Sequence, residues 1–297
     1  ELLLELYSEE IPPRLQIGAR SQLKQLIENA FKEDNINYKN LSVYSSPTRL
    51  TLHIKELAEK IKITSKEVKG PKVGSPDQIL KGFVKAKNVT EKDLFAKETE
   101  KGKFYYIKTI PKTILVEDLL TKTLPKALNS ISWKKSMKWS DYSMMWGRPL
   151  RSIFAKFNNK KIDFKFNHLE TTNEIIIEQD LMFKTKKINN FKEYLTFLKT
   201  HEIIIDHKER EEIILKRISS ISKWKDYKEN LNLQLIEEVV NIVEDPNVLL
   251  VSFSKDYLKI PQEIIISTLE KHQRYFPIFD RRDHLTNYFF LVANKKD

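Results

Sequence analysis

The sequence predicts an α+β fold in which mixed, mostly antiparallel sheets pack against helices in two subdomains. An apolar run typical of a buried strand, Glu1–Tyr7, precedes a long segment with the 3.6-residue period of a one-sided helix. Two runs with strand character follow that segment. Of the 297 residues, 40% are hydrophobic and 31% are charged, so the chain can bury a core.

The first elements follow from local patterns. Pro12 and Pro13 open a helix whose apolar positions recur at three- and four-residue steps: Leu15, Ala19, Leu23, Ile27 and Phe31. Leu41–Tyr44 and Leu50–Ile54 are predicted strands, and Pro47 forces a turn between them.

The middle of the chain mixes helices and strands. After the breaker Lys69–Gly70–Pro71, Ser75 is expected to cap a helix with Pro76 at its first position. The sequence then predicts a strand, a helix interrupted at Pro125, and two further strands: Lys103–Thr109, Val116–Leu128, Ile153–Phe157 and Lys161–Phe166.

The second half alternates more regularly. Three helices are expected at Phe191–Thr200, after the cap Asp206, and at Leu235–Val243, and a fourth runs from Pro261 to Arg274. Strands are expected at Ile203–Ile205, Val248–Phe253, Tyr275–Phe279 and Tyr288–Ala293. We expect an N-terminal domain over residues 1–165 and a second over 190–297, with the boundary around 165–190.

The charge is uneven along the chain. The net charge is +11, but 42 of the 52 basic residues are Lys, and compositional drift toward lysine explains such an excess equally well. Residues 101–138 hold nine basic groups against Glu117 and Asp118, a net +7. A positive region this confined favours a polyanionic partner.

Several chemistries have no signature here. The chain has no cysteine, no glycine-rich phosphate loop and no nucleophile elbow. Its six histidines form no zinc motif; His201 and His207 are more typical of solvated or capping residues. The run 134–138 (KKSMK) is a scrambled form of a synthetase ATP loop without the partner motif. No apolar run approaches the ~20 residues of a membrane helix, and the first residues of the sequence show no signal-peptide pattern.

Aromatic residues and cations alternate from 133 to 151. Trp133 and Trp139 bracket the lysines, and Tyr142, Trp146, Arg148 and Arg151 follow. Aromatic faces can stack on exposed bases while cations contact phosphates, as single-stranded RNA recognition requires. The alternative is that the tryptophans anchor the core and the lysines only coat the surface.

These segments resemble the β subunit of bacterial heterotetrameric glycyl-tRNA synthetase. The similar motifs occur in the family's order: ELLLELYSEEIPP (1–13), SSPTRLTL (45–52), VKGP (68–71), LKGFVKAKNV (80–89), KSMKW (135–139), RPLRSIFA (148–155), IIIDHKEREEI (203–213), LIEEVVNIVEDPNVLL (235–250), KIPQEIIISTLEKHQRYFPIFD (259–280) and FLVAN (290–294). The resemblance covers roughly the first half of such a subunit. It departs at Asn173–Phe183, where the family has a Gly-His-Arg-Phe-like segment.

The resemblance implies a cytoplasmic, non-catalytic subunit. It implies that the chain supports tRNA(Gly) binding and α2β2 assembly, while ATP, Mg and glycine are handled by the partner α subunit. No catalytic residue, metal or cofactor is expected in this chain. The alternatives are a stand-alone RNA-binding module and a hydrolase that edits mischarged tRNA.

Eight cations are candidates for tRNA or subunit contact: Arg49, Lys69, Lys135, Lys138, Arg148, Arg151, His272 and Arg274. His272 and Arg274 also lie at the end of a helix, where the helix dipole stabilises a cation whether or not RNA is bound. Arg210 is expected to pair with nearby acids.

Overall fold

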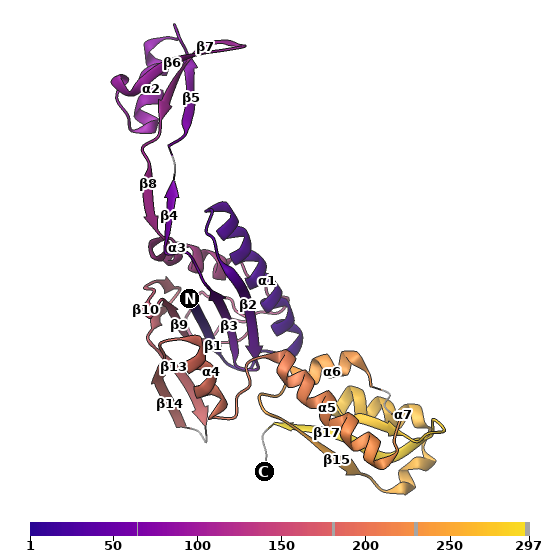
Figure 1. Cartoon of the computed structure of the whole chain (residues 1–297). Coiled ribbons are helices and arrows are strands. Elements are labelled where there is room, and N and C mark those ends of the chain that lie inside the picture. Colours follow the sequence, from indigo (N-terminus) through magenta and orange to yellow (C-terminus); the bar gives the residue numbers. More distant parts are fainter. Residues whose placement is uncertain (64, 180–181, 229–230, 295–297) are drawn as a thin grey trace. The chain divides into compact units, whose positions relative to one another are not determined.

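The computed structural model describes residues 1–63, 65–179, 182–228 and 231–294 (Figure 1). The chain divides into two compact units, one formed by Glu1–Leu57 with Leu120–Asp297 and the other by Ala58–Leu119. Helices and mostly antiparallel sheets alternate along the chain, which confirms the α+β class.

A seven-stranded sheet forms the centre of the first unit. Its strands are β1 (Leu2–Ser8), β2 (Lys39–Ser46), β3 (Arg49–Lys55), β9 (Leu150–Phe157), β10 (Lys160–Lys161), β11 (Lys165–Phe166) and β12 (Leu169–Thr172). Their order is β11-β12-β9-β1-β3-β2, with β10 paired to β9. All of these pairs are antiparallel except β12 with β9. Every residue of β1 is buried, as expected for an apolar run between two neighbours.

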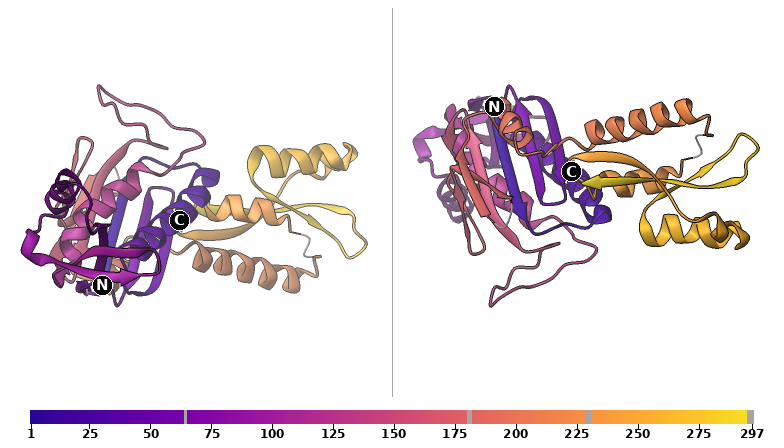
Figure 2. Two further views of the ribbon diagram at one scale, coloured as in Figure 1. Left: turned by 90° about the horizontal axis from the view of Figure 1, so that it is seen from above. Right: turned by 90° about the horizontal axis from the view of Figure 1, so that it is seen from below.

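Helix α1 (Pro13–Glu33) covers one face of this sheet, and its buried residues include the five apolar positions expected. A hairpin of β13 (Glu174–Gln179) and β14 (Met182–Lys187), with α4 (Phe191–Lys199), covers the other (Figure 2). Ile175 and Ile177 of β13 pack with Leu3 and Phe154 of the sheet.

This hairpin falls in the range 165–190, where a domain boundary is expected. The two compact units do not divide there, and that boundary stays a prediction about subdomains. The divergent segment Asn173–Phe183 supplies β13 and the start of β14, while its residues 180 and 181 lie outside the described ones.

Helix α3 (Val116–Asn129) corrects one expectation, because it continues through Pro125. A proline inside a helix costs about 3 kcal/mol. Leu120, Leu124 and Leu128 are fully or almost fully buried, and this packing outweighs the cost.

The C-terminal part of the first unit packs helices on a three-stranded sheet. Its elements are α5 (His207–Lys225), α6 (Leu233–Val240), β15 (Pro246–Ser252), η2 (Lys255–Lys259), α7 (Gln262–Ser267), the π-helical turn η3 (Thr268–Gln273), β16 (Phe276–Phe279) and β17 (Leu285–Asn294). The sheet order is β15-β17-β16, and Ile214, Ile218, Val248 and Phe290 belong to its core.

Two expectations for this part were wrong. Residues 203–205 form no strand: Ile203 and Ile205 are buried, but the Ile203 N–H donates back to the Leu198 carbonyl and the Ile204 N–H to the Glu244 carbonyl, which is no strand ladder. Helix α6 ends at Val240 because Asn241 turns out of the helix. The expected cap of α5 is confirmed, since the Asp206 carboxylate accepts a bond from the Lys208 N–H.

The described residues of the second unit form two small sheets, the helix α2 and a short 3-10 helix. Its elements are β4 (Lys60–Ile63), β5 (Glu67–Lys72), α2 (Asp77–Lys87), η1 (Glu91–Asp93), β6 (Leu94–Thr99), β7 (Gly102–Lys108) and β8 (Lys112–Leu115). The strands form the antiparallel sheets β5-β7-β6 and β4-β8. The cap of α2 is Pro76 without a side-chain bond, so the expected Ser75 cap was wrong. Gly70 lets Phe83 approach β5, since a Cβ there would lie 2.8 Å from the ring.

Candidate functional site

The cationic stretch expected from the sequence lies on a long loop of the first unit, residues 130–149 (Figure 2). Within the loop a β-bridge joins Met137 and Trp146, which exchange backbone hydrogen bonds of 2.9 and 3.3 Å. Beneath the bridge the rings of Trp133 and Trp146 pack with centroids 4.9 Å apart. A Cβ at Gly147 would lie 2.5 Å from the Trp133 ring, so only glycine fits this contact.

The other two aromatic residues of the loop pack on His168. The Tyr142 ring stacks on the imidazole with centroids 3.5 Å apart, and Trp139 meets it edge-on at 6.0 Å. Lys135 and Lys138 are exposed and have no ion-pair partner among the described residues. The aromatic rings thus hold the loop in place, and the lysines face solvent.

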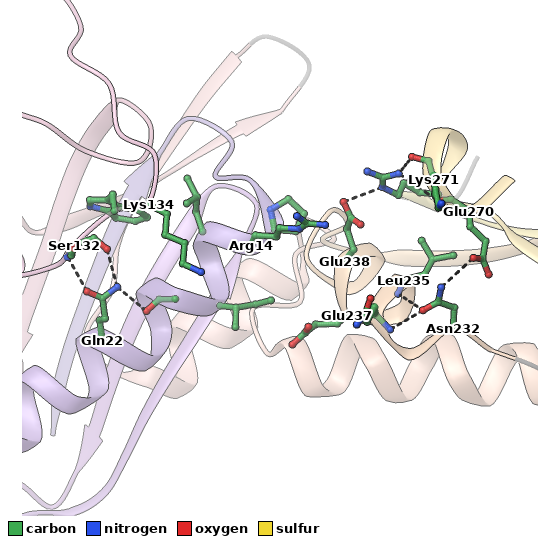
Figure 3. Close-up of a pocket in the computed structure, with 17 residues that line it drawn as sticks. Arg14, Gln22, Ser132, Lys134, Asn232, Leu235, Glu237, Glu238, Glu270 and Lys271 are labelled. Carbon is green, nitrogen blue, oxygen red and sulfur yellow. Dashed lines mark hydrogen bonds and ion pairs between the residues drawn. The ribbon is translucent and has the colours of Figure 1, made fainter. Parts of the chain in front are cut away.

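A groove of about 800 Å³, here called the Arg274 groove, lies on one side of the loop (Figure 3). One wall comes from the start of α1 and the loop, with Arg14 and Lys134. The other comes from α6 and η3, with Glu238 and Arg274. Arg14 and Lys134 have no ion-pair partner in the described part of the chain. One wall therefore offers free positive charge, whereas charges on the other are partly paired.

Arg274 is positioned by its own neighbours. Its Nε lies 3.0 Å from the Glu238 carboxylate, and its guanidinium donates to the carbonyls of Glu270 and Lys271 at the end of η3. Its backbone is left-handed, with φ of 61°. A cation that closes a helix end in this way is stabilised without a ligand. His272, two residues earlier, is exposed.

A second groove, of about 940 Å³, is lined by Arg49, Arg148 and Arg151 and is called the Arg151 groove. Arg151 forms ion pairs with Glu9 and Glu178, and its guanidinium lies 5.7 Å from the Phe183 ring centroid. Arg148 is half-buried and donates to the Gly147 carbonyl at 2.8 Å. The structure thus brings together three of the eight predicted cations.

Arg49 lies below the surface of this groove. Its side chain is 1% exposed and 3.2 Å from the equally buried Glu5 carboxylate, and it donates to the Ile176 carbonyl at 2.6 Å. Burial raises the pKa of Glu5, while Arg49 and the Tyr194 hydroxyl lower it in part. Arg49 has almost no surface to offer a phosphate. Its contact with RNA stays a prediction that this geometry does not favour.

Lys69 belongs to the second unit, on β5. Its ammonium nitrogen lies 3.5 Å from the centroid of the Phe104 ring, a cation–π contact. The contact holds the cation over the small sheet. The other seven candidates belong to the first unit.

The loop joins the two grooves. Lys134 lines the Arg274 groove, Met137 lines the Arg151 groove, and Pro13 of α1 lines both. The exposed Lys135 lies between these two loop positions in the sequence. The exposed lysines suit binding of an anionic partner along the loop itself, since both grooves also hold acidic side chains.

Sequence patterns missed part of this site. Arg14 and Lys134 were not singled out, although Arg14 directly follows the Pro12–Pro13 signal. The role of the buried Arg210 was missed as well. The guanidinium of Arg210 donates to the carbonyls of Val240, Ile204 and Ser45, so it pairs with backbone oxygens and not with acids as expected.

The described residues contain neither a cluster of metal ligands nor a helix that could span a membrane. Within residues 1–63, 65–179, 182–228 and 231–294, no three or more histidine or acidic side chains cluster as metal ligands would. In the same ranges no helix combines the length and apolar character that a bilayer crossing needs.

Fold and site together define an α+β protein with an exposed cationic loop between two grooves. The model of the glycyl-tRNA synthetase beta subunit family matches residues 2–297, and the chain belongs to that family. It is 34% identical over 294 residues to the glycine–tRNA ligase beta subunit of Rickettsia typhi and 33% identical over 295 residues to that of Rickettsia peacockii. Each match covers 99% of this chain and 44% of the relative, so the chain spans less than half of their length.

Proposed function

We propose that this chain is the N-terminal portion of a non-catalytic glycyl-tRNA synthetase β subunit that binds tRNA(Gly) and supports α2β2 assembly in the cytoplasm. The subunit serves the ATP-dependent attachment of glycine to tRNA. ATP and Mg are handled by the partner α subunit. Membership of the family supports the general assignment, and the cationic loop supports the tRNA contact.

The observation that carries the tRNA proposal is the geometry of Lys135 and Lys138. Both side chains are exposed on a loop that Trp133 and Trp146 hold in place. Pre-positioned cations lose little conformational entropy when they contact a phosphate. Five of the nine basic residues of the +7 region belong to the same unit as the loop and supply a field of the right sign: Lys122, Lys126, Lys134, Lys135 and Lys138.

The absence of a catalytic role is proposed on the chemistry of the grooves. No histidine is among the described residues that line either groove. Three of the four carboxylates that line the Arg151 groove are engaged: Glu9 and Glu178 by Arg151, and Glu244 by the hydroxyls of Ser46 and Thr48. Engaged carboxylates of this kind are suited to holding structure more than to proton transfer.

The test uses the full-length subunit with its α partner. Charge reversal at both lysines, Lys135→Glu with Lys138→Glu, should weaken tRNA binding and reduce the slope of log K against log salt by about 1–2. The matched control reverses Lys192 and Lys199, two exposed lysines of α4 that line neither groove. Equal effects of the two double variants would contradict a specific role for the loop.

The catalytic assignment needs its own measurement. Glycylation by the α subunit should require the β subunit, while purified β subunit alone should not hydrolyse mischarged tRNA. Deacylation by the β subunit that a single groove substitution abolishes would instead establish an editing enzyme.

A further inference from the structure

The strand β15 forms an open edge of the C-terminal sheet (Figure 1). It pairs with β17 in unbroken register from Pro246–Asn294 to Ser252–Tyr288. Within the described ranges no backbone hydrogen bond joins β15 to a segment on its other side. Alternate N–H and C=O groups along this side are therefore available to a further strand.

This edge lacks the protection that exposed strands normally carry. Soluble proteins guard their edges with charges, internal prolines or bulges. The sequence of β15, PNVLLVS, has no charged residue, and its one proline is the first position. The edge strand β14 of the same unit reads MFKTKK and holds three lysines. Of these two edge strands, only β15 is therefore suited to pair with a further strand.

A hollow of about 320 Å³ lies between β15 and α5. Ile221 and Trp224 line it from the helix, and Leu249 and Leu250 from the strand. Trp224 is 76% exposed and Leu249 is 37% exposed. Burial of a tryptophan side chain is strongly favourable, and tryptophans are enriched at the centres of protein interfaces. The hollow can take one large apolar side chain.

The helix beside the hollow is positively charged. After Glu212 its exposed cations have no ion-pair partner among the described residues, and they are Lys216, Arg217, Lys223 and Lys225. No acidic residue lies between Glu212 and Asp226. The Lys225 ammonium lies 4.0 Å from the Trp224 ring centroid. A partner at this place would be favoured by negative charge.

We propose that the β15 edge and the adjoining hollow bind an extended protein segment that is apolar at its centre and acidic on its flanks. The segment adds a fourth strand to the sheet, inserts an apolar side chain against Trp224, and pairs its acids with the cations of α5. A second copy of this chain fits poorly, because it would bring two sets of four cations together. RNA fits less well, because the apolar side chains of β15 offer phosphates no partner and the carbonyls that alternate with the N–H groups of the edge repel phosphate oxygens.

The probe is a fluorescein-labelled nine-residue peptide in which glutamate alternates with valine around a central leucine. Its binding to the full-length subunit is followed by fluorescence anisotropy. Binding should saturate, and Leu249→Lys or Trp224→Ala should each raise Kd by about tenfold or more. The same peptide with lysine in place of glutamate should also bind about tenfold more weakly.

Matched controls separate this surface from general effects. Leu258 is 38% exposed and Tyr257 is 58% exposed, on η2. Leu258→Lys and Tyr257→Ala should leave Kd within about twofold. All four substitutions are at exposed positions, and unchanged circular dichroism establishes that each variant is folded.

Three results would overturn the proposal. The first is no saturable peptide binding, or equal losses in Leu249→Lys and Leu258→Lys. The second is binding of a nine-nucleotide oligouridylate that Trp224→Ala abolishes while the peptide fails, which would make this an RNA surface. The third is a concentration-dependent dimer in sedimentation that Leu249→Lys dissociates, which would make the occupant a second copy.

Discussion

The guanidinium group of Arg49 lies 3.2 Å from the carboxylate of Glu5, and both side chains are almost completely buried between the central sheet and the β13–β14 hairpin. The pair is held by further bonds, because the Tyr194 hydroxyl donates to Glu5 at 2.5 Å and Arg49 donates to Ile176. Taking one member away would leave the other charge buried without its partner.

We therefore expect Arg49→Leu to lower the free energy of unfolding by about 3–5 kcal/mol, measured by urea denaturation. The double variant Glu5→Leu with Arg49→Leu should recover much of this loss, since two apolar side chains replace the pair. Arg148→Leu, at a half-buried arginine with one carbonyl contact, serves as the control and should change stability by less than about 1 kcal/mol. A loss in Arg148→Leu as large as in Arg49→Leu would refute the special role of the buried pair.

Arg210 is expected to hold α5 against the central sheet. Its side chain is fully buried and donates to three carbonyls, at 2.9, 2.5 and 3.0 Å. Lysine cannot reproduce this planar arrangement of donors. Arg210→Lys should cost about 2–4 kcal/mol in urea denaturation and speed proteolysis near α5. The exposed Arg217 of the same helix is the control, and Arg217→Lys should be neutral. Identical urea midpoints for the two variants would exclude this role.

Gly147 is expected to fix the shape of the cationic loop. A Cβ at this position would lie 2.5 Å from the Trp133 ring, which is itself packed on Trp146. Gly147→Ala should therefore cost about 1–3 kcal/mol and weaken tRNA binding by the full-length subunit without changing any charge. Gly18→Ala provides a control of opposite sign, because the nearest atom to its Cβ would be 3.9 Å away and alanine favours the interior of α1. An unperturbed Gly147→Ala variant would show that the ring can move aside freely.

The elements that the sequence predicted well have long, regular patterns. The helical period of α1 and the apolar run of β1 are enough to predict these two elements, because an element buried on one or both faces has a matching pattern of apolar residues. The strands of two to six residues in the range 165–187 are too short to show such a pattern. Their pairing depends on contacts with distant residues, such as Ile175 and Ile177 with Phe154.

The same limit applied to the candidate site. The exposed lysines at 135 and 138 were found because a local run of charge is visible in one dimension. From the sequence, Arg49 beside the turn at Pro47 was expected to be equally exposed to a tRNA phosphate. Only the register of β1 with β3, which places Glu5 opposite Thr51 and Tyr7 opposite Arg49, shows that the arginine points toward a buried carboxylate.

His207 should make the stability of the fold dependent on pH. It is the first residue of α5, its side chain is 22% exposed, and burial followed by the positive charge of Arg20 lowers its pKa to about 4. An unfolded histidine titrates near 6.5, so between about pH 6.5 and pH 4 the unfolded chain binds a proton that the folded chain does not. The stability contributed by the uncharged His207 is therefore complete above pH 6.5, and it is lost as the pH is lowered through this window. Because the ring is partly solvated, we expect a loss of about 1–2 kcal/mol, less than the full shift implies.

The measurement is urea denaturation at pH 7 and pH 4.5 for the wild type, His207→Gln and His272→Gln. Glutamine at 207 does not titrate, so that variant should lose about 1–2 kcal/mol less stability on acidification than the wild type. His272 is exposed, and its replacement should leave the loss on acidification as it is in the wild type. If all three proteins lose the same stability between the two pH values, proton binding at His207 does not contribute.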